Sequence, residues 1–96
     1  MLEEPLTRTA AQALIRRVAH SGAGVKFTGH AHERMLKWGL SEPDCLRVLR
    51  GGEVTRPAYK RLGVWRYRVE TASVTCVVVL RSETVFVVWT TWRKTR

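Results

Sequence analysis

The segment VWRYRVE, residues 64–70, alternates between two kinds of side chain. Trp65, Tyr67 and Val69 are apolar or aromatic, whereas the positions between them are charged. A period of two is typical of a β-strand that buries one face and exposes the other. The apolar period changes from helical to two after Gly52, so this segment belongs to a second half of the chain that forms a sheet.

Two further segments predict strands of the same sheet. SVTCVVVLR, residues 73–81, and TVFVVWTTW, residues 84–92, are rich in β-branched and aromatic residues, which favour strands. Turns are expected near residues 71–72 and 82–83, and such short connections imply antiparallel pairing. AYKRL, residues 58–62, is a candidate for an additional strand.

Three helices are predicted in the first half of the chain. The first covers residues 7–20, where apolar residues recur at helical spacing, and the second runs over residues 29–38. The third follows Ser41, a good N-cap with Asp44 three residues later. A short strand is expected at residues 25–28.

The order of these elements predicts an α+β fold. Helices come first and strands after, so we expect two or three helices packed on one face of a three- to four-stranded antiparallel sheet. The other face of the sheet is then free for a partner. No linker-like stretch or repeat divides the 96 residues, so we expect one domain with an N-terminal helical part (1–24), a core (25–93) and a basic tail (94–96).

The charge balance indicates a polyanionic partner. The chain carries 17 basic and 8 acidic residues, a formal net charge of +9. Such an excess on a small surface favours nucleic acid first, an anionic membrane surface second, and an acidic partner protein as a third alternative. The N-terminus lacks the pattern of a secretion signal, and the longest apolar run, residues 76–80, is far too short to span a membrane. We therefore expect a soluble cytoplasmic protein.

No metal or cofactor site is expected. Cys45 and Cys76 are the only cysteines, and together with the three histidines they show no zinc-binding spacing. Each cysteine is expected to pack as a small apolar residue in a reducing cytosol.

The second predicted helix carries a candidate phosphate site. At roughly 100° per residue, His30, Arg34 and Lys37 fall on one polar flank, while His32 lies on nearly the opposite side. His30 is also close to the helix N-terminus, where free N–H groups favour an anion. Arginine binds phosphate through a planar fork of donors, and histidine transfers protons near neutral pH. The alternative is an ordinary solvated helix surface, which spacing alone favours.

The sequence around this flank resembles a known family. Residues 27–54, FTGHAHERMLKWGLSEPDCLRVLRGGEV, are similar to the opening of a small bacterial family described as domain of unknown function 4258. That family has the motif F-T-x-H-A-x-x-R-M, then a glycine, a short helix and a G-E-V-like exit. VVWTTWR, residues 87–93, is similar to the family's last strand. The matching positions are His30, Ala31, Arg34, Met35, Gly39, Gly52, Glu53 and Val54.

This resemblance implies both a fold and an activity. Related domains are grouped with the toxin ribonucleases of the barnase–EndoU–colicin–RelE-like fold. The resemblance therefore implies helices packed on a four-stranded antiparallel sheet and a metal-independent site that cleaves RNA. It also favours His30 and Arg34 over His32 as the site residues.

A second basic surface is predicted over residues 54–69, which hold five cations and no acid. Arg66 and Arg68 share one face of a strand, where they either track a phosphate backbone or only keep that face in water. Tyr59, close to a loop, is the preferred ring for stacking on an unpaired base. At the end of the last strand, Thr90 or Thr91 can hold a phosphate oxygen, although β-propensity alone explains both.

These features predict a toxin-type endoribonuclease that cleaves single-stranded RNA by metal-independent acid–base chemistry. His30 is expected to transfer protons, Arg34 to stabilise the phosphorane, and Thr91 to complete the catalytic set. The predicted substrate-binding residues are Lys37, Tyr59, Arg66 and Arg68. Expected partners are RNA and an acidic antitoxin protein. One alternative is a non-catalytic nucleic-acid-binding module. The other is a basic interaction domain that docks on an acidic protein, for which a phage-encoded protein is one option.

Overall fold

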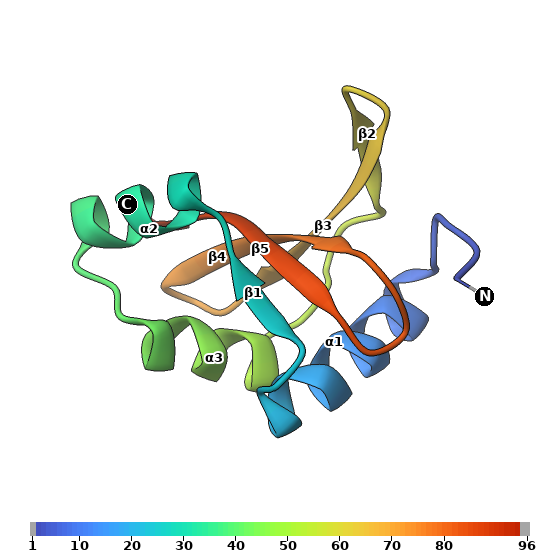
Figure 1. Ribbon diagram of the computed structural model, residues 1–96, viewed down its shortest axis with the longest axis horizontal. Helices are drawn as coiled ribbons and strands as arrows, with labels where there is room; N and C mark the ends of the chain where they lie inside the picture. The colour runs from blue at the N-terminus through green and yellow to red at the C-terminus, as the bar shows by residue number, and fades with distance from the viewer. Residues whose placement is uncertain (1, 95–96) are drawn as a thin grey trace.

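The computed structural model describes residues 2–94 and contains helices and strands in the predicted order (Figure 1). The elements are α1 (Arg8–Ser21), β1 (Val25–Phe27), α2 (Gly29–Trp38), α3 (Glu42–Gly51), β2 (Tyr59–Arg61), β3 (Val64–Glu70), β4 (Val74–Leu80) and β5 (Phe86–Arg93). The predicted α+β class is confirmed, with one strand more than the largest sheet expected. Within the described residues, no helix is both long enough and apolar enough to cross a membrane.

The strands form one sheet in the order β1-β5-β4-β3-β2. From β2 to β5 they make an antiparallel meander, as the short turns predict. The short β1 instead lies parallel to β5 at the edge, with Val25 opposite Phe86. The prediction of an antiparallel sheet holds for the meander but not for β1, because most of the chain separates β1 from β5 and no local turn sets their direction.

The helices are distributed unevenly around the sheet. α1 and α3 lie side by side under one face of the meander, and α2 lies at the end where β5 finishes (Figure 1). Within residues 2–94 no helix covers the opposite face of the meander, which we call the open face. The expected free face of the sheet is therefore present.

The covered face of the sheet packs on the apolar sides of α1 and α3. Leu49 of α3, Tyr67 of β3 and Phe86 of β5 are among its largest fully buried side chains. The hydroxyl of Tyr67 donates to Oε2 of Glu4 at 3.0 Å and accepts the N–H of Leu6 at 3.0 Å. Burial raises the pKa of Tyr67 to about 12, so this phenol stays neutral in the core.

A β-bulge in the middle of β5 changes which of its residues face the core. Val88 and Thr90 lie opposite two consecutive residues of β4, so Trp89, between them, is an extra residue without a partner across the ladder. Inward and outward positions exchange at this point. As a result Thr91 faces the core, whereas Thr90 faces the open side.

Thr28 fixes the start of α2 against β5. Its hydroxyl accepts the N–H of Ala31 at 2.9 Å, as an N-cap does, and donates to the carbonyl of Trp89 at 3.0 Å. At the other end of the helix, Nε of Arg93 donates to the carbonyl of Trp38 at 2.7 Å. α2 is therefore held along the second half of β5 at both ends.

The predicted basic tail at residues 94–96 is only partly described. Nζ of Lys94 lies 3.1 Å from Oε1 of Glu70, and the backbone N–H of Lys94 donates to the carbonyl of Ser73. Lys94 is thus tied to β3 and to the β3–β4 turn, whereas positions 95 and 96 lie outside the described residues.

Candidate nucleic-acid interface on the open face

The alternation along β3 places its two arginines on the open face. Arg66 and Arg68 point away from α1 and α3, while Tyr67 points toward them. The two arginines line a groove of about 430 Å³, within the roughly 300–1,000 Å³ range of small-molecule sites. We call it the open-face groove, and its lining residues are His30, Tyr59, Arg61, Leu62, Arg66, Arg68, Val77, Trp89, Thr90 and Trp92.

Arg66 is a buried cation without a counterion. Only 6% of the residue is exposed, and its guanidinium carbon lies 4.8 Å from the centre of the Trp89 ring. Its buried Nε makes no hydrogen bond, and no carboxylate in residues 2–94 forms an ion pair with the side chain. A buried charge with no partner is costly, so this arrangement needs a reason other than stability.

Arg68 repeats the arrangement one position further along the same strand face. Its guanidinium carbon lies 5.3 Å from the centre of the Tyr59 ring and 5.7 Å from the centre of the Trp92 ring. Its Nε is also buried without a hydrogen-bond partner among the described residues. Aromatic rings on β2 and β5 therefore hold the second guanidinium between them.

Glu70 follows Arg68 on the same face of β3, but its carboxylate interacts with groups other than Arg68. The hydroxyl of Thr55 donates to Oε2 of Glu70 at 2.7 Å, and Nζ of Lys94 lies 3.1 Å from Oε1. The hydrogen bond from Thr55 and the contacts with Lys94 lower the pKa of Glu70 below its usual value. Glu70 is therefore ionised at neutral pH and already paired, so it does not neutralise Arg68.

His30 reaches the groove from the side of β5. It is the second residue of α2, two positions after the Thr28 cap that holds the helix to the carbonyl of Trp89. Its ring is exposed and lines the groove together with Trp89 and Thr90. The groove thus brings an imidazole from α2 to the same surface as the arginines of β3.

His32 lies on a different surface, as the helical spacing predicts. Its Nε2 lies 2.9 Å from Oε2 of Glu42 at the start of α3. Its ring stacks on Phe27, with 5.6 Å between the ring centres. These contacts give His32 a structural role between β1, α2 and α3.

The other predicted residues of the helix flank do not line the groove. Arg34 is half-buried one turn after His30, and Lys37 is exposed with its ammonium 5.6 Å from the centre of the Trp38 ring. Neither side chain is part of the groove lining. Shared helical spacing therefore does not bring Arg34 and Lys37 to the surface that His30 reaches.

The structure places Thr91 on the wrong side of the sheet for the role predicted for it. Thr91 is fully buried, and its hydroxyl donates to the carbonyl of Thr75 at 2.8 Å. Sγ of Cys76 lies 3.5 Å from the same hydroxyl. The bulge at Trp89 turns Thr91 toward the core, so the residue that lines the groove is its neighbour Thr90.

Two tryptophans of the groove were not predicted as site residues. Trp89 and Trp92 supply the rings against which Arg66 and Arg68 lie. Their positions in β5 depend on the bulge, which strict alternation does not predict. Composition offers one signal for these tryptophans. One strand carries two arginines and another carries two tryptophans, and arginines bind favourably to aromatic rings when both strands present them on the same face of a sheet.

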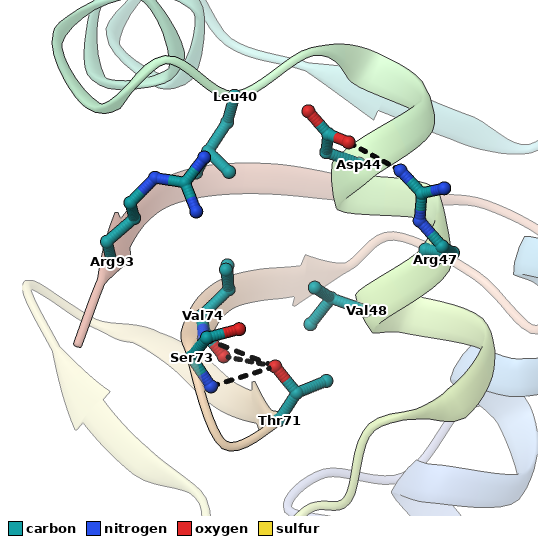
Figure 2. A pocket seen from close by; sticks show the side chains of 8 residues that line it. All are labelled: Leu40, Asp44, Arg47, Val48, Thr71, Ser73, Val74 and Arg93. Carbon is teal, nitrogen blue, oxygen red and sulfur yellow. Dashed lines mark hydrogen bonds and ion pairs between the residues drawn. The ribbon is translucent and has the colours of Figure 1, made fainter.

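A second hollow, about 300 Å³ in volume, lies between α3 and the β3–β4 turn (Figure 2). Ser41 donates its backbone N–H to the Asp44 carboxylate and so lowers the pKa of Asp44, and Arg47 lies 2.5 Å from the same carboxylate. The side chains of Thr71 and Arg93 form hydrogen bonds with backbone groups. The polar groups of this hollow serve the fold, so we assign it no function.

No family model matches the chain, and no curated protein or solved structure matches it. Residues 2–94 contain no group of three or more His, Cys, Asp or Glu side chains placed to hold a metal ion. Cys45 and Cys76 are buried free thiols. The open-face groove is therefore the feature on which a function can be based.

Proposed function

We propose that this protein is a small endoribonuclease that binds single-stranded RNA in the open-face groove and cleaves it without a metal ion. The observation that carries the proposal is the convergence in one groove of His30 with the buried Arg66 and the half-buried Arg68, neither of which forms an ion pair within residues 2–94. Unpaired guanidinium groups suit phosphates, and the faces of aromatic rings suit unpaired bases.

The proposed reaction uses the 2′-hydroxyl of the RNA as nucleophile. The 2′ oxygen forms a bond to phosphorus while the bond from phosphorus to the 5′ oxygen breaks, which leaves a 2′,3′-cyclic phosphate and a 5′-hydroxyl. His30 accepts the 2′ proton, and the departing 5′ oxygen takes a proton from water or from the hydroxyl of Tyr59. Arg66 and Arg68 stabilise the extra negative charge of the phosphorane.

Several expectations from the sequence belong to the same proposal. The resemblance to the family of domain of unknown function 4258 favours His30, and the net charge of +9 favours a polyanion. A toxin of this kind acts in the cytoplasm and needs a neutralising acidic partner, whose carboxylates would compete with phosphates for Arg66 and Arg68. Arg34 and Lys37 then contribute outside the groove, as part of the positive surroundings.

Replacing His30 by alanine tests the chemistry. Purified protein is incubated with total RNA in the presence of a chelator, and the new RNA ends are analysed for 2′,3′-cyclic phosphates. His30→Ala should cut about 10²–10⁴ times more slowly than wild type, the usual loss on removing one acid–base group. Because His30 is exposed, folding and RNA affinity should change little.

His32→Ala is the matched control, since it removes a second exposed histidine from the same helix and away from the groove. It should cut RNA at nearly the wild-type rate. Equal rates for His30→Ala and wild type would refute the catalytic role of His30. Wild-type protein that binds RNA but leaves it intact would favour the non-catalytic binding module.

A further inference from the structure

Arg66 is the most unusual charged group in the described chain, because it is nine-tenths buried and unpaired. We infer that Arg66 is the anchoring seat for one phosphate of a nucleic-acid strand, and that Arg68 holds the next phosphate along. The inference deepens the proposed function, on which it rests for the identity of the groove. It assigns the recognition of the strand to β3 rather than to Arg34 on α2.

The surroundings of the Arg66 guanidinium favour a bidentate hydrogen-bonded contact with a planar pair of acceptor oxygens. The guanidinium carbon of Arg66 lies 4.8 Å from the centre of the Trp89 ring, and a ring face in contact with a guanidinium restrains its orientation while the terminal N–H groups can still donate to an acceptor. Nε of Arg66 is buried and makes no hydrogen bond within residues 2–94, and no ion pair there holds the side chain, so a ligand does not have to displace an internal partner. Phosphate oxygens match such a fork of donors.

The spacing of the two arginines suits a chain of phosphates rather than an isolated anion. Arg66 and Arg68 are two residues apart on one strand face, which separates them by about 6.5–7 Å along the strand. Successive phosphates of an extended nucleic-acid strand have a comparable separation. The rings of Tyr59 and Trp92 on either side of Arg68 offer surfaces for the bases or sugars between those phosphates.

The buried charge also predicts a link between ligand binding and stability. Desolvating Arg66 without a counterion destabilises the folded state, and a bound phosphate supplies the missing charge. A ligand that binds only the folded protein raises its unfolding temperature in proportion to the logarithm of ligand concentration. Anions that fit the seat should therefore stabilise the wild-type protein through Arg66.

Thermal unfolding at constant ionic strength tests this inference. The ligands are inorganic phosphate, a nucleoside 3′-monophosphate and a short single-stranded DNA, which lacks the 2′-hydroxyl and is not cut. Arg66→Met, which keeps the length of the side chain and removes its charge, should be at least as stable as wild type without ligand and should bind the DNA at least tenfold more weakly. Arg47→Met is the control, because it removes an exposed arginine that is paired with Asp44 on α3, and it should keep the wild-type response.

Arg66→Lys keeps the positive charge and loses the planar fork, so it provides an answer even if Arg66→Met folds poorly. The inference predicts weaker DNA binding for this variant too, and wild-type affinity would overturn it. It is also overturned if Arg66→Met keeps wild-type affinity or is less stable than wild type without ligand. Equal affinity for inorganic phosphate and for the DNA would leave a general anion site and contradict the strand assignment.

These outcomes are distinguishable from a failure of the proposed function. A protein that binds the DNA through Arg66 but cuts no RNA supports the phosphate seat and contradicts the ribonuclease. A protein that cuts RNA with an unchanged KM after Arg66→Met keeps the ribonuclease and contradicts the seat.

Discussion

Thr90 and Thr91 are neighbours in the chain, yet their side chains lie on opposite sides of the sheet. Thr90 lines the open-face groove, and Thr91 is buried with its hydroxyl on the carbonyl of Thr75. Neighbouring residues of a strand point to opposite faces, and the unpaired Trp89, which shifts the register of β5, decides which of the two threonines faces the core. At this scale one inserted residue decides which hydroxyl faces the open-face groove.

This contrast predicts a purely structural role for Thr91. Thr91→Val has nearly the same shape and loses the buried hydrogen bonds of the hydroxyl to the Thr75 carbonyl and to Sγ of Cys76, so the free energy of unfolding should fall by about 1–3 kcal/mol, the cost of removing the partner of a buried polar group. RNA cleavage per folded molecule should stay at the wild-type level. Chemical denaturation and a cleavage assay on the same preparation check both values, and a stable but inactive variant would restore Thr91 to the catalytic set.

Among the elements, α2 and β5 form the unit that positions the site. Thr28 caps the helix and also donates to the carbonyl of Trp89 in the bulge. One hydroxyl therefore links the backbone that presents His30 to the backbone that presents the ring beneath Arg66. The geometry of the groove depends on this link between two elements that are distant in sequence.

Thr28→Ala should weaken both stability and function. Loss of the N-cap costs about 1 kcal/mol, and the loosened start of α2 should lower the cleavage rate more than it lowers RNA affinity. Thr7→Ala is the matched control, since Thr7 caps α1 by accepting the N–H of Ala10 and lies away from the groove. It should lose similar stability and keep full activity per folded molecule. Equal activity losses in both variants would show that the link to Trp89 is unimportant.

Local pattern predicts most of the fold and only part of the candidate site. The period of 3.6 and the caps at Ser41 and Gly22 mark the helices, and alternation marks β3, because these signals depend on nearby residues. The parallel pairing of β1 with β5 depends on contacts across most of the chain, which no local pattern encodes.

The same limit explains the site. Arg66, Arg68 and Tyr59 were predicted from alternation and composition, and the structure brings them into one groove with His30. The rings of Trp89 and Trp92 and the burial of Thr91 follow from the bulge, and a bulge is set by three-dimensional packing rather than by the identity of neighbouring residues.

For the whole molecule, the net charge of +9 should make nucleic-acid binding strongly dependent on salt. Each phosphate contact to a single strand contributes about 0.7 to the slope of log affinity against log salt concentration. Replacing Arg66 and Arg68 together by methionine should therefore lower the slope by about 1.4. Fluorescence anisotropy with a labelled single-stranded oligonucleotide measures it.

A charge-matched control separates the groove from general attraction. Arg17→Met with Arg47→Met removes the same charge from α1 and α3, on the covered side of the sheet, and should leave the slope nearly unchanged. Equal slopes for the two double variants would mean that binding is diffuse and does not use the groove.

The most direct test of the proposed nucleic-acid site is an NMR titration that follows the side-chain indole N–H signals of the four tryptophans. The ligand is a short single-stranded DNA that the protein cannot cleave. Because Trp89 and Trp92 line the open-face groove and Trp38 lies on α2 outside it, the signals of Trp89 and Trp92 should shift on titration while that of Trp38 stays in place. A titration in which Trp38 shifts and the groove tryptophans do not would contradict the assignment of the open face as the nucleic-acid interface.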